Sequence, residues 1–385
     1  MTPSFGNICI AGAGIMGLSV AYALKQTHPQ TPVVMADPRG LPPARCASLM
    51  AGGMLAPWSE IEHLPAEFFN AALSGIKFWE SLKPEKTGFS RNGSLLLAHH
   101  EDLHLLDRFS PKLSGLENWA LAGAQEIATL EPALAERFER GIFLPQEAFV
   151  YPPQIMGSLT KEISFPVADI CDFNIQKKNF DWLIDCRGYG AAADLPDLRG
   201  VKGEIVVVRN RDFSLNRPVR LMHPRYPIYI VPRPEHEFLI GATLIESADD
   251  VITVKSTMEL LSAAYSLHPS FGEAEILSVL AGIRPAYPDN LPRITIDGNI
   301  IRCNGLFRHG YLLAPVMAQC VADYITGKDN EFMHLFFRPC HSERSEESRG
   351  RKERSFANAQ DDNKDKGTNN DRHHQRSGKN LHRAA

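Results

Sequence analysis

Apolar and polar positions follow two patterns along most of this chain, one with the period of a strand and one with the period of a helix. Short apolar runs bounded by glycine, proline or polar residues predict strands, and apolar residues spaced three and four apart predict helices. Strands are expected at residues 8–11, 33–36, 93–98, 203–208, 228–232, 238–243, 293–296 and 300–303, and helices at 68–82, 257–268 and 314–326. This alternation predicts an α/β protein with an antiparallel sheet in its middle part.

The first two strands enclose a glycine-rich turn, within ICIAGAGIMGLSVAYALKQTHPQTPVVMAD at residues 8–37. Gly12 allows a tight turn, Gly14 lets the main chain approach a pyrophosphate, and Gly17 lets the following helix pack closely on the strand. Asp37 lies 20 residues after Gly17, where a carboxylate accepts hydrogen bonds from ribose hydroxyls and repels a 2′-phosphate. A glycine turn alone would also fit a loop without a ligand. With its strands, helix and acid it predicts a dinucleotide site, for NAD or FAD.

Composition narrows the class of protein without identifying a reaction. Hydrophobic residues make up 44% and charged residues 22% of the 385 residues, as in globular proteins of about two domains. We find no apolar run of the ~20 residues that a membrane helix needs and no signal peptide before the first strand. Seven cysteines without a C-x-x-C pair, and histidines without ligand spacing, predict reduced thiols in a cytoplasmic protein and no metal site.

Charge is distributed unevenly along the chain. Residues 341–385 carry 11 basic and 8 acidic side chains, whereas the other 340 residues carry 30 and 37. The acidic main part argues against nucleic acid as the main partner. The tail, residues 339–385, holds hardly any large apolar side chain, so we expect it to be disordered. Its segment CHSERSEESR is similar to a translated bacterial repeat element, and a basic interaction tail is the alternative interpretation.

Three later segments carry a resemblance to a known family. ARCASLMAGGMLAPWSE at residues 44–60 resembles the flavin-contacting loop of the D-amino acid oxidase (DAO) family of FAD-dependent oxidoreductases, especially its glycine oxidase (ThiO) branch. GIRPAYPDNLP at 282–292 resembles the family's substrate-arginine strand, and NGLFRHGYLLAPVMAQ at 304–319 resembles its flavin-closing turn and last helix. YIVPR at 229–233 and GAT at 241–243 also match. The similarity runs from about residue 7 to 327 and implies FAD as the cofactor.

The resemblance implies an architecture as well. We expect a Rossmann-like FAD-binding domain into which a mostly antiparallel α+β substrate domain is inserted, as in D-amino acid oxidases. The FAD-binding domain would be discontinuous and would comprise residues 1–80, 145–200 and 282–338. The substrate domain would comprise residues 81–144 and 201–281.

Six further residues are implied in FAD binding by the resemblance. Ser48 would contact the pyrophosphate or the ribityl chain, and Met54 would lie near the flavin, although Met54 could equally fill a gap in the core. Val167 matches the position whose main chain contacts the adenine. The others are Gly188, Gly305 and Gly310.

The residues around Gly188, Gly305 and Gly310 match the family pattern to different degrees. Gly188 lies in WLIDCRGYGA (182–191), where Cys186 and Arg187 replace the small residues that are usual in the family. Gly305 and Gly310 enclose a turn before the last helix, and the positive end of that helix would face the reduced flavin. An ordinary loop before a core helix is the alternative.

An α-amino acid substrate offers a carboxylate, which a guanidinium fork can bind through two hydrogen bonds. The resemblance implies that Arg284 binds this carboxylate, that the Tyr229 hydroxyl assists, and that Arg308 is a second cation close to the flavin. Without the family, each arginine could be an ion-pair residue and Tyr229 a core side chain with a bonded hydroxyl. We interpret His309 as a turn histidine with satisfied hydrogen bonds, because hydride transfer from a neutral amine requires no base.

The implied reaction is FAD-dependent oxidation of glycine, sarcosine or a small D-amino acid to the imine, with oxygen as acceptor and hydrogen peroxide as product. In the ThiO branch the imine enters the thiazole branch of thiamine biosynthesis, which makes a thiazole synthase a candidate partner. One alternative is a tRNA-modifying flavoprotein of the same fold that demethylates a wobble-uridine side chain; the acidic main part argues against it. Another is a flavin- or NAD-binding protein without turnover; Arg284 and Tyr229 together argue against that. The sequence leaves open whether the chain is a homo-oligomer.

Overall fold

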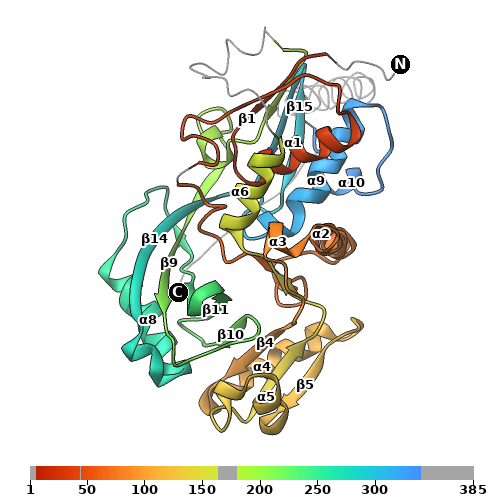
Figure 1. The fold of residues 1–385 in the computed structure, drawn as a ribbon. Helices are drawn as coiled ribbons and strands as arrows, with labels where there is room; N and C mark the ends of the chain where they lie inside the picture. Colours follow the sequence, from red (N-terminus) through yellow and green to blue (C-terminus); the bar gives the residue numbers. More distant parts are fainter. Residues whose placement is uncertain (1–5, 44, 164–179, 340–385) are drawn as a thin grey trace, which may run out of the picture. The chain divides into compact units, whose positions relative to one another are not determined.

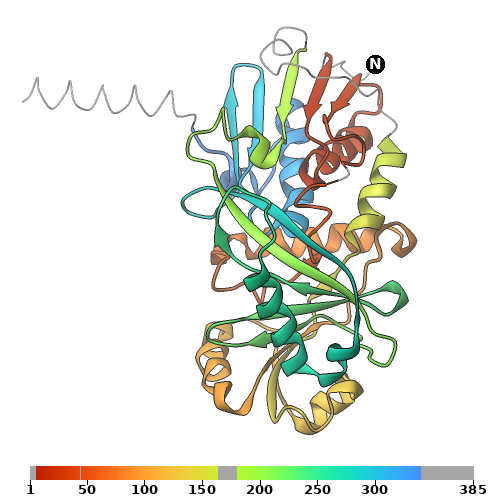
Figure 2. The same cartoon turned by 90° about the vertical axis from the view of Figure 1, so that its left-hand side faces the viewer.

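The structure of this chain, a computed structural model, describes residues 6–43, 45–163 and 180–339 (Figure 1). Val167 and residues 340–385 of the predicted tail lie outside the described residues. Residues up to Arg338 belong to one compact unit. Two large sheets organise this unit, and Figure 2 shows the smaller sheet above and the larger one below. Among the described residues, every helix is too short or too polar to span a membrane.

The smaller sheet has five strands in the order β15-β16-β8-β1-β2. Neighbouring strands are parallel, except that β15 is antiparallel to β16. The strands are β1 (Ile8–Ala11), β2 (Val33–Ala36), β8 (Trp182–Asp185), β15 (Arg293–Asp297) and β16 (Ile300–Asn304). Helix α1 (Ile15–Thr27) connects β1 to β2. The predicted strand, glycine turn, helix and strand are therefore confirmed.

Helices cover the smaller sheet and share one apolar core with it. Helix α1 packs against α6 and α9, and α2 packs against α9. These helices are α2 (Phe69–Ser81), α6 (Pro152–Ile163) and α9 (Gly310–Ile325), with the short helices α3 (Pro84–Thr87) and α10 (Met333–Phe336) beside them. The core extends from Ile8 and Ile10 in the sheet to Trp79 in α2 and Leu313 in α9. The predicted helix at 68–82 is confirmed.

Helix α9 begins four residues before the predicted start at residue 314 and contains Pro315. A proline in a helix leaves the carbonyl four residues earlier without its main-chain donor. Here that carbonyl belongs to Tyr311, and it accepts a hydrogen bond from Trp79 Nε1 at 2.7 Å. The helix therefore continues through the proline because a side chain of α2 supplies the missing donor.

The larger sheet has nine strands and is mostly antiparallel. Its order is β13-β9-β12-β11-β10-β4-β6-β5, and β14 pairs with β9 as well. Only β10 and β4 are a parallel pair among the described strands of this sheet. The strands are β4 (Ser94–Ala98), β5 (Ala120–Gly123), β6 (Arg140–Leu144), β9 (Arg199–Arg209), β10 (Val219–Met222), β11 (Ile228–Arg233), β12 (Glu237–Gly241), β13 (Ile245–Glu246) and β14 (Glu275–Ala286). The α/β class with a parallel sheet and a mostly antiparallel one is confirmed.

A second apolar core lies between the larger sheet and its helices. Helix α8 (Val254–Leu267) packs on β9, β11 and β12, and starts at a cap in which Thr253 Oγ1 accepts from Ser256 N at 3.2 Å. The short helices α4 (Leu103–Phe109) and α5 (Ala124–Leu130) flank β4, β5 and β6. The sequence patterns did not predict α4, α5, β5 or β6. The predicted domain boundaries remain a prediction, although β9 and β14 extend across two of them.

Candidate functional site

A cavity of about 840 Å³ lies where the two sheets meet, and residues of both contribute to its wall. This volume is near the upper end of the range for small-molecule and cofactor sites, ~300–1,000 Å³. Eight of the predicted cofactor- and substrate-binding residues line it: Gly14, Ser48, Met54, Gly188, Tyr229, Arg284, Arg308 and Gly310. Gly12, Gly17, Asp37 and Gly305 do not line the cavity.

The glycine turn between β1 and α1 has the geometry that a pyrophosphate site requires. Gly12 has a φ of 98°, and a Cβ there would lie 2.5 Å from the Cys186 carbonyl oxygen. A Cβ on Gly17 would overlap the Gly12 carbonyl oxygen. Gly14 lies directly before α1 and faces the cavity, and the first turn of this helix contains no acidic residue. An anion at this helix end would be stabilised by the helix dipole.

The loop after β2 approaches the same helix end. Ser48 Oγ accepts a hydrogen bond from Ile15 N at 3.0 Å, and the Ser48 carbonyl accepts one from the Tyr311 hydroxyl at 3.0 Å. Met54 lies in the short strand β3 (Met54–Leu55), which pairs with β7 (Ala148–Phe149), and it packs against an apolar cluster around Met50. Ser48 therefore connects α1, α9 and the cavity wall.

The turn between β16 and α9 closes another side of the cavity. Gly305 has a φ of 79°, and a Cβ there would overlap the Tyr287 ring. The shape of the turn and the packing of Tyr287 therefore account for a glycine at this position. Gly310 is the first residue of α9 and faces the cavity. The Gly188 carbonyl accepts a hydrogen bond from Asn304 Nδ2 at 2.9 Å, which ties the turn after β8 to the end of β16.

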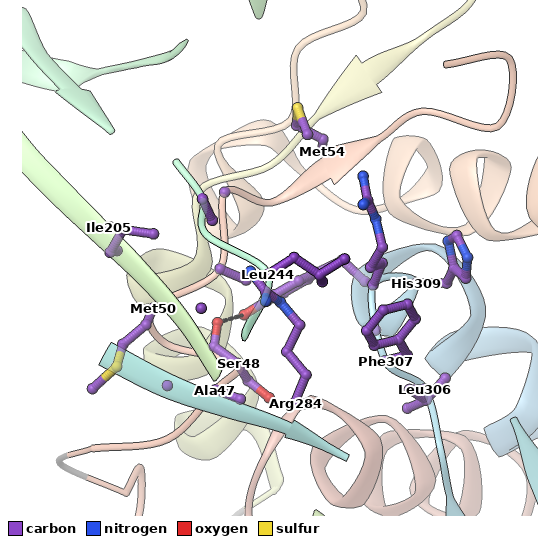
Figure 3. Close-up of a pocket in the computed structure, with 18 of the residues that line it drawn as sticks. Ala47, Ser48, Met50, Met54, Ile205, Leu244, Arg284, Leu306, Phe307 and His309 are labelled. Atoms are coloured by element: carbon purple, nitrogen blue, oxygen red, sulfur yellow. Dashed lines mark hydrogen bonds between the residues drawn. The ribbon is translucent and has the colours of Figure 1, made fainter. Parts of the chain in front are cut away.

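Arg284 in β14 and Tyr229 in β11 belong to the larger sheet, and both line the cavity. Arg284 is in β14, opposite Val201 of β9, and its Nη1 donates to the Thr243 carbonyl at 3.1 Å. A Cβ on Gly203 would overlap the guanidinium. Burial lowers the pKa of Arg284, and Tyr229 opposes this shift. In Figure 3 Arg284 reaches toward the middle of the cavity.

Arg308 takes part in a buried ion network that the sequence reading missed. Arg308 Nη2 lies 2.6 Å and Arg220 Nη1 lies 3.1 Å from Glu60 Oε1. Arg220 also donates to the Ser59 carbonyl at 2.7 Å. Burial raises the pKa of Glu60, but the two arginines outweigh this and lower it to about 2. The Glu60 carboxylate therefore faces two guanidinium groups, those of Arg308 and Arg220. One negative charge balances only one of the two positive charges, so the network has a net positive charge.

His309 is buried beside this network, with 2% of its surface exposed. Burial lowers its pKa to about 4, so the ring is neutral near pH 7. Its Nε2 has no hydrogen-bond partner among the described residues. The expectation of a satisfied turn histidine is therefore wrong for Nε2. The low pKa makes the ring a weak proton acceptor, which agrees with a residue that does not act as a base.

Replacing His309 by glutamine should make the folded protein less sensitive to acid. The folded pKa of about 4 lies below the usual value of 6.5, so the unfolded chain binds more protons between these pH values. This histidine therefore removes stability as the pH falls from 6.5 to 4, by about 3 kcal/mol at most. Denaturant unfolding at several pH values should show a shallower loss for His309→Gln. An unchanged slope would contradict the buried neutral state.

These features fit FAD. At Gly14 no side chain separates the main chain from the cavity, so a pyrophosphate can approach it closely. The N-terminal ends of α1 and α9 face the same cavity, and its volume suits a large cofactor. Gly14 and Ser48 would lie at the pyrophosphate, and Gly310 with the start of α9 would lie at the flavin.

Comparison with known families decides between the dinucleotides. The sequence profile of "DAO: FAD dependent oxidoreductase" matches residues 7–324. The chain belongs to the DAO family. As a DAO-family protein it is an FAD-dependent oxidoreductase, and NAD is excluded as the primary cofactor of the glycine turn.

Individual relatives agree with the DAO assignment. The chain is 44% identical over 319 residues to the putative thiamine biosynthesis oxidoreductase ThiO of Rhizobium etli, which covers 82% of this chain and 95% of that protein. It is 26% identical to the bifunctional protein ThiO/ThiG of Synechocystis, over 86% of this chain and 53% of that protein. The crystal structure of glycine oxidase from Geobacillus kaustophilus has a TM-score of 0.72 at 22% identity, over 86% of this chain and 98% of that one. This last likeness confirms the D-amino acid oxidase type of fold.

Proposed function

We propose that this DAO-family enzyme oxidises glycine, or a similarly small amino acid such as sarcosine or D-alanine, to the imine. The observation that carries the proposal is the partly buried guanidinium of Arg284. It faces the same cavity as the glycine turn and has no carboxylate within ion-pair distance among the described residues. A buried cation without an anionic partner is costly, and a substrate carboxylate would supply that partner.

The residues around Arg284 support a defined orientation of the substrate. The guanidinium can bind a carboxylate through two hydrogen bonds. The Tyr229 ring packs against Gly52 and Gly241, at 3.1 Å and 3.0 Å from the Cβ positions of these glycines, which fixes the ring close to Arg284. The Tyr229 hydroxyl would then donate to the same carboxylate. Holding the carboxylate in this way fixes the position of Cα in the cavity.

The remaining chemistry belongs to the cofactor and to the charges near it. When bound, FAD accepts the hydride that leaves the substrate Cα, and the electrons pass on to oxygen, giving hydrogen peroxide. The net positive network of Arg220, Arg308 and Glu60 favours the neutral amine over the ammonium form, because a positive charge nearby disfavours a second one. The neutral amine is the form whose lone pair can expel a hydride.

The wider role follows from the relatives. Because a putative thiamine biosynthesis oxidoreductase is 44% identical and a bifunctional ThiO/ThiG protein also matches, we place the imine product in thiazole formation for thiamine. The partner would be a thiazole synthase, and the reaction would take place in the cytoplasm.

Anaerobic reduction of the bound flavin tests this proposal directly. Purified holoenzyme is mixed with glycine, sarcosine or D-alanine, and the loss of flavin absorbance is followed. We expect glycine or one of the other two to bleach the flavin, and glycolate, which lacks the amine, to leave it oxidised. Flavin that none of the three amino acids reduces would contradict oxidation of a small amino acid.

A further inference from the structure

The Asp37 carboxylate already has a full set of hydrogen bonds. Oδ1 accepts from the main-chain N and from Nε of Arg39, at 3.0 Å and 2.8 Å. Oδ2 accepts from Ala13 N at 3.0 Å and from Arg39 Nη2 at 2.7 Å. A carboxylate has about four acceptor positions, and these four donors occupy them. The Asp37 side chain is also 0% exposed, so it cannot accept from ribose hydroxyls as the sequence predicted while Arg39 stays in place.

Arg39 presents the accessible part of this pair. Its side chain is 44% exposed and lines the cavity, together with Gly14 and Ser48. A guanidinium has five N–H groups. Two of them bind Asp37, and Nη1 makes one long hydrogen bond of 3.4 Å to the Arg45 carbonyl. The other two N–H groups, one on each Nη, have no partner among the described residues, and they remain as donors for a ligand.

The pair stands at the place where a dinucleotide has its adenosine ribose. Asp37 follows β2, and Ala13, whose N–H it holds, belongs to the glycine turn after β1. In parallel α/β sheets the ligand lies outside the carboxyl ends of the strands, with the ribose at the end of the second strand. The group that meets the ribose there is the Arg39 guanidinium.

We propose that Arg39 binds the ribose hydroxyls of the FAD adenosine, and that Asp37 is a positioning residue that holds the guanidinium in place. The hydroxyl oxygens accept the two remaining N–H groups of Arg39. Asp37 acts through Arg39, and its loss would release the guanidinium. The adenosine end of the site therefore presents a cation to the ligand instead of a carboxylate.

The affinity of the apoprotein for FAD tests this assignment. Apoprotein is titrated with FAD, and quenching of the flavin fluorescence gives Kd. Arg39→Ala should raise Kd about tenfold to a hundredfold, the range for lost hydrogen bonds to a charged group. Arg39→Lys should recover only part of the loss, since an ammonium lacks the planar fork.

Arg140→Ala is the matched control. Arg140 also pairs with a carboxylate through both Nη atoms, to Asp107 at 3.1 Å and 3.3 Å, and lies outside the cavity wall. It should leave Kd unchanged. The melting temperatures of the apoproteins show whether each variant is folded, and Arg39→Gln replaces Arg39→Ala if the latter is not.

The opposite result has a clear meaning. If Arg39 only covers an Asp37 that binds the ribose itself, Arg39→Ala would free the carboxylate, and FAD would bind as tightly as before or more tightly. That outcome would overturn the proposal.

An FAD analogue without the two hydroxyls on the adenosine ribose gives a second check. The analogue should bind more weakly than FAD to the wild-type chain, but as well as FAD to Arg39→Ala. An equal loss in both proteins would also overturn the assignment.

Discussion

Replacing Arg284 by alanine should lower kcat/KM for the amino acid substrate by about 2–5 kcal/mol, the range for removing one partner of a buried charge pair. This corresponds to a loss of about thirtyfold to several-thousandfold. FAD content should stay at the wild-type level, because Arg284 lies in β14 and its contacts are with Thr243 and Gly203, away from the glycine turn. Stopped-flow reduction by glycine and the flavin-to-protein absorbance ratio measure the two properties separately.

Two further substitutions make this test specific. Arg284→Lys should restore only a part of the rate, since an ammonium cannot reproduce the planar fork. Arg209→Ala is the control, because Arg209 lies at the far end of the same β9–β14 ladder, where it pairs with Glu237 at 2.9 Å and does not line the cavity. It should reduce as fast as the wild type. If Arg284→Ala were reduced at the wild-type rate and affinity, another group would have to bind the carboxylate.

Gly17→Ala should weaken FAD binding at least about tenfold. The added Cβ would overlap the carbonyl oxygen of Gly12, so α1 would have to move away from β1 and carry its N-terminal end with it. Forcing one extra carbon into such packing costs about 1–3 kcal/mol or more in stability. The purified variant should be colourless or bind FAD at least about tenfold more weakly, as each 1.4 kcal/mol is a tenfold change in Kd.

Gly157→Ala is a matched control for this substitution. Gly157 lies inside helix α6, and a Cβ there would meet no atom within 4 Å. Alanine has the higher helix propensity, so this variant should be as stable as the wild type or slightly more stable, with full FAD content. A yellow Gly17→Ala protein with wild-type affinity would mean that the close packing of α1 on β1 is not needed for the cofactor.

The sequence predicted best where the relevant contacts are local. The unit of β1, glycine turn, α1 and β2 depends on residues within 30 positions of one another, and all its elements are confirmed. The short elements α4, α5, β5 and β6 were missed, because each is only four to seven residues long and is stabilised by packing in the two apolar cores rather than by a long periodic pattern. Pro315 also led to a late predicted start of α9, since only the folded chain brings Trp79 to the carbonyl that the proline leaves free.

In the candidate site, too, some features could be predicted from the sequence and others depend on contacts made only in the folded chain. Arg284, Tyr229 and Arg308 were found through the family resemblance, and the structure places them on one cavity. Their charge balance could not be read from the chain, because Glu60 is separated from Arg308 by 248 positions. Arg39, by contrast, lies only two positions after Asp37 in the sequence. An arginine so close to a predicted ribose-binding acid is a signal that sequence reading can use.

The hydrogen bond from Trp79 to the Tyr311 carbonyl imposes an order on how this protein can evolve. While residue 315 is proline, the loss of the indole leaves a buried carbonyl without a donor, at a cost of about 1–3 kcal/mol. Once residue 315 is alanine, the helix supplies its own N–H and the indole becomes dispensable for this bond. The two positions are therefore epistatic. A lineage can exchange the proline first and the tryptophan afterwards, whereas the reverse order passes through a destabilised intermediate.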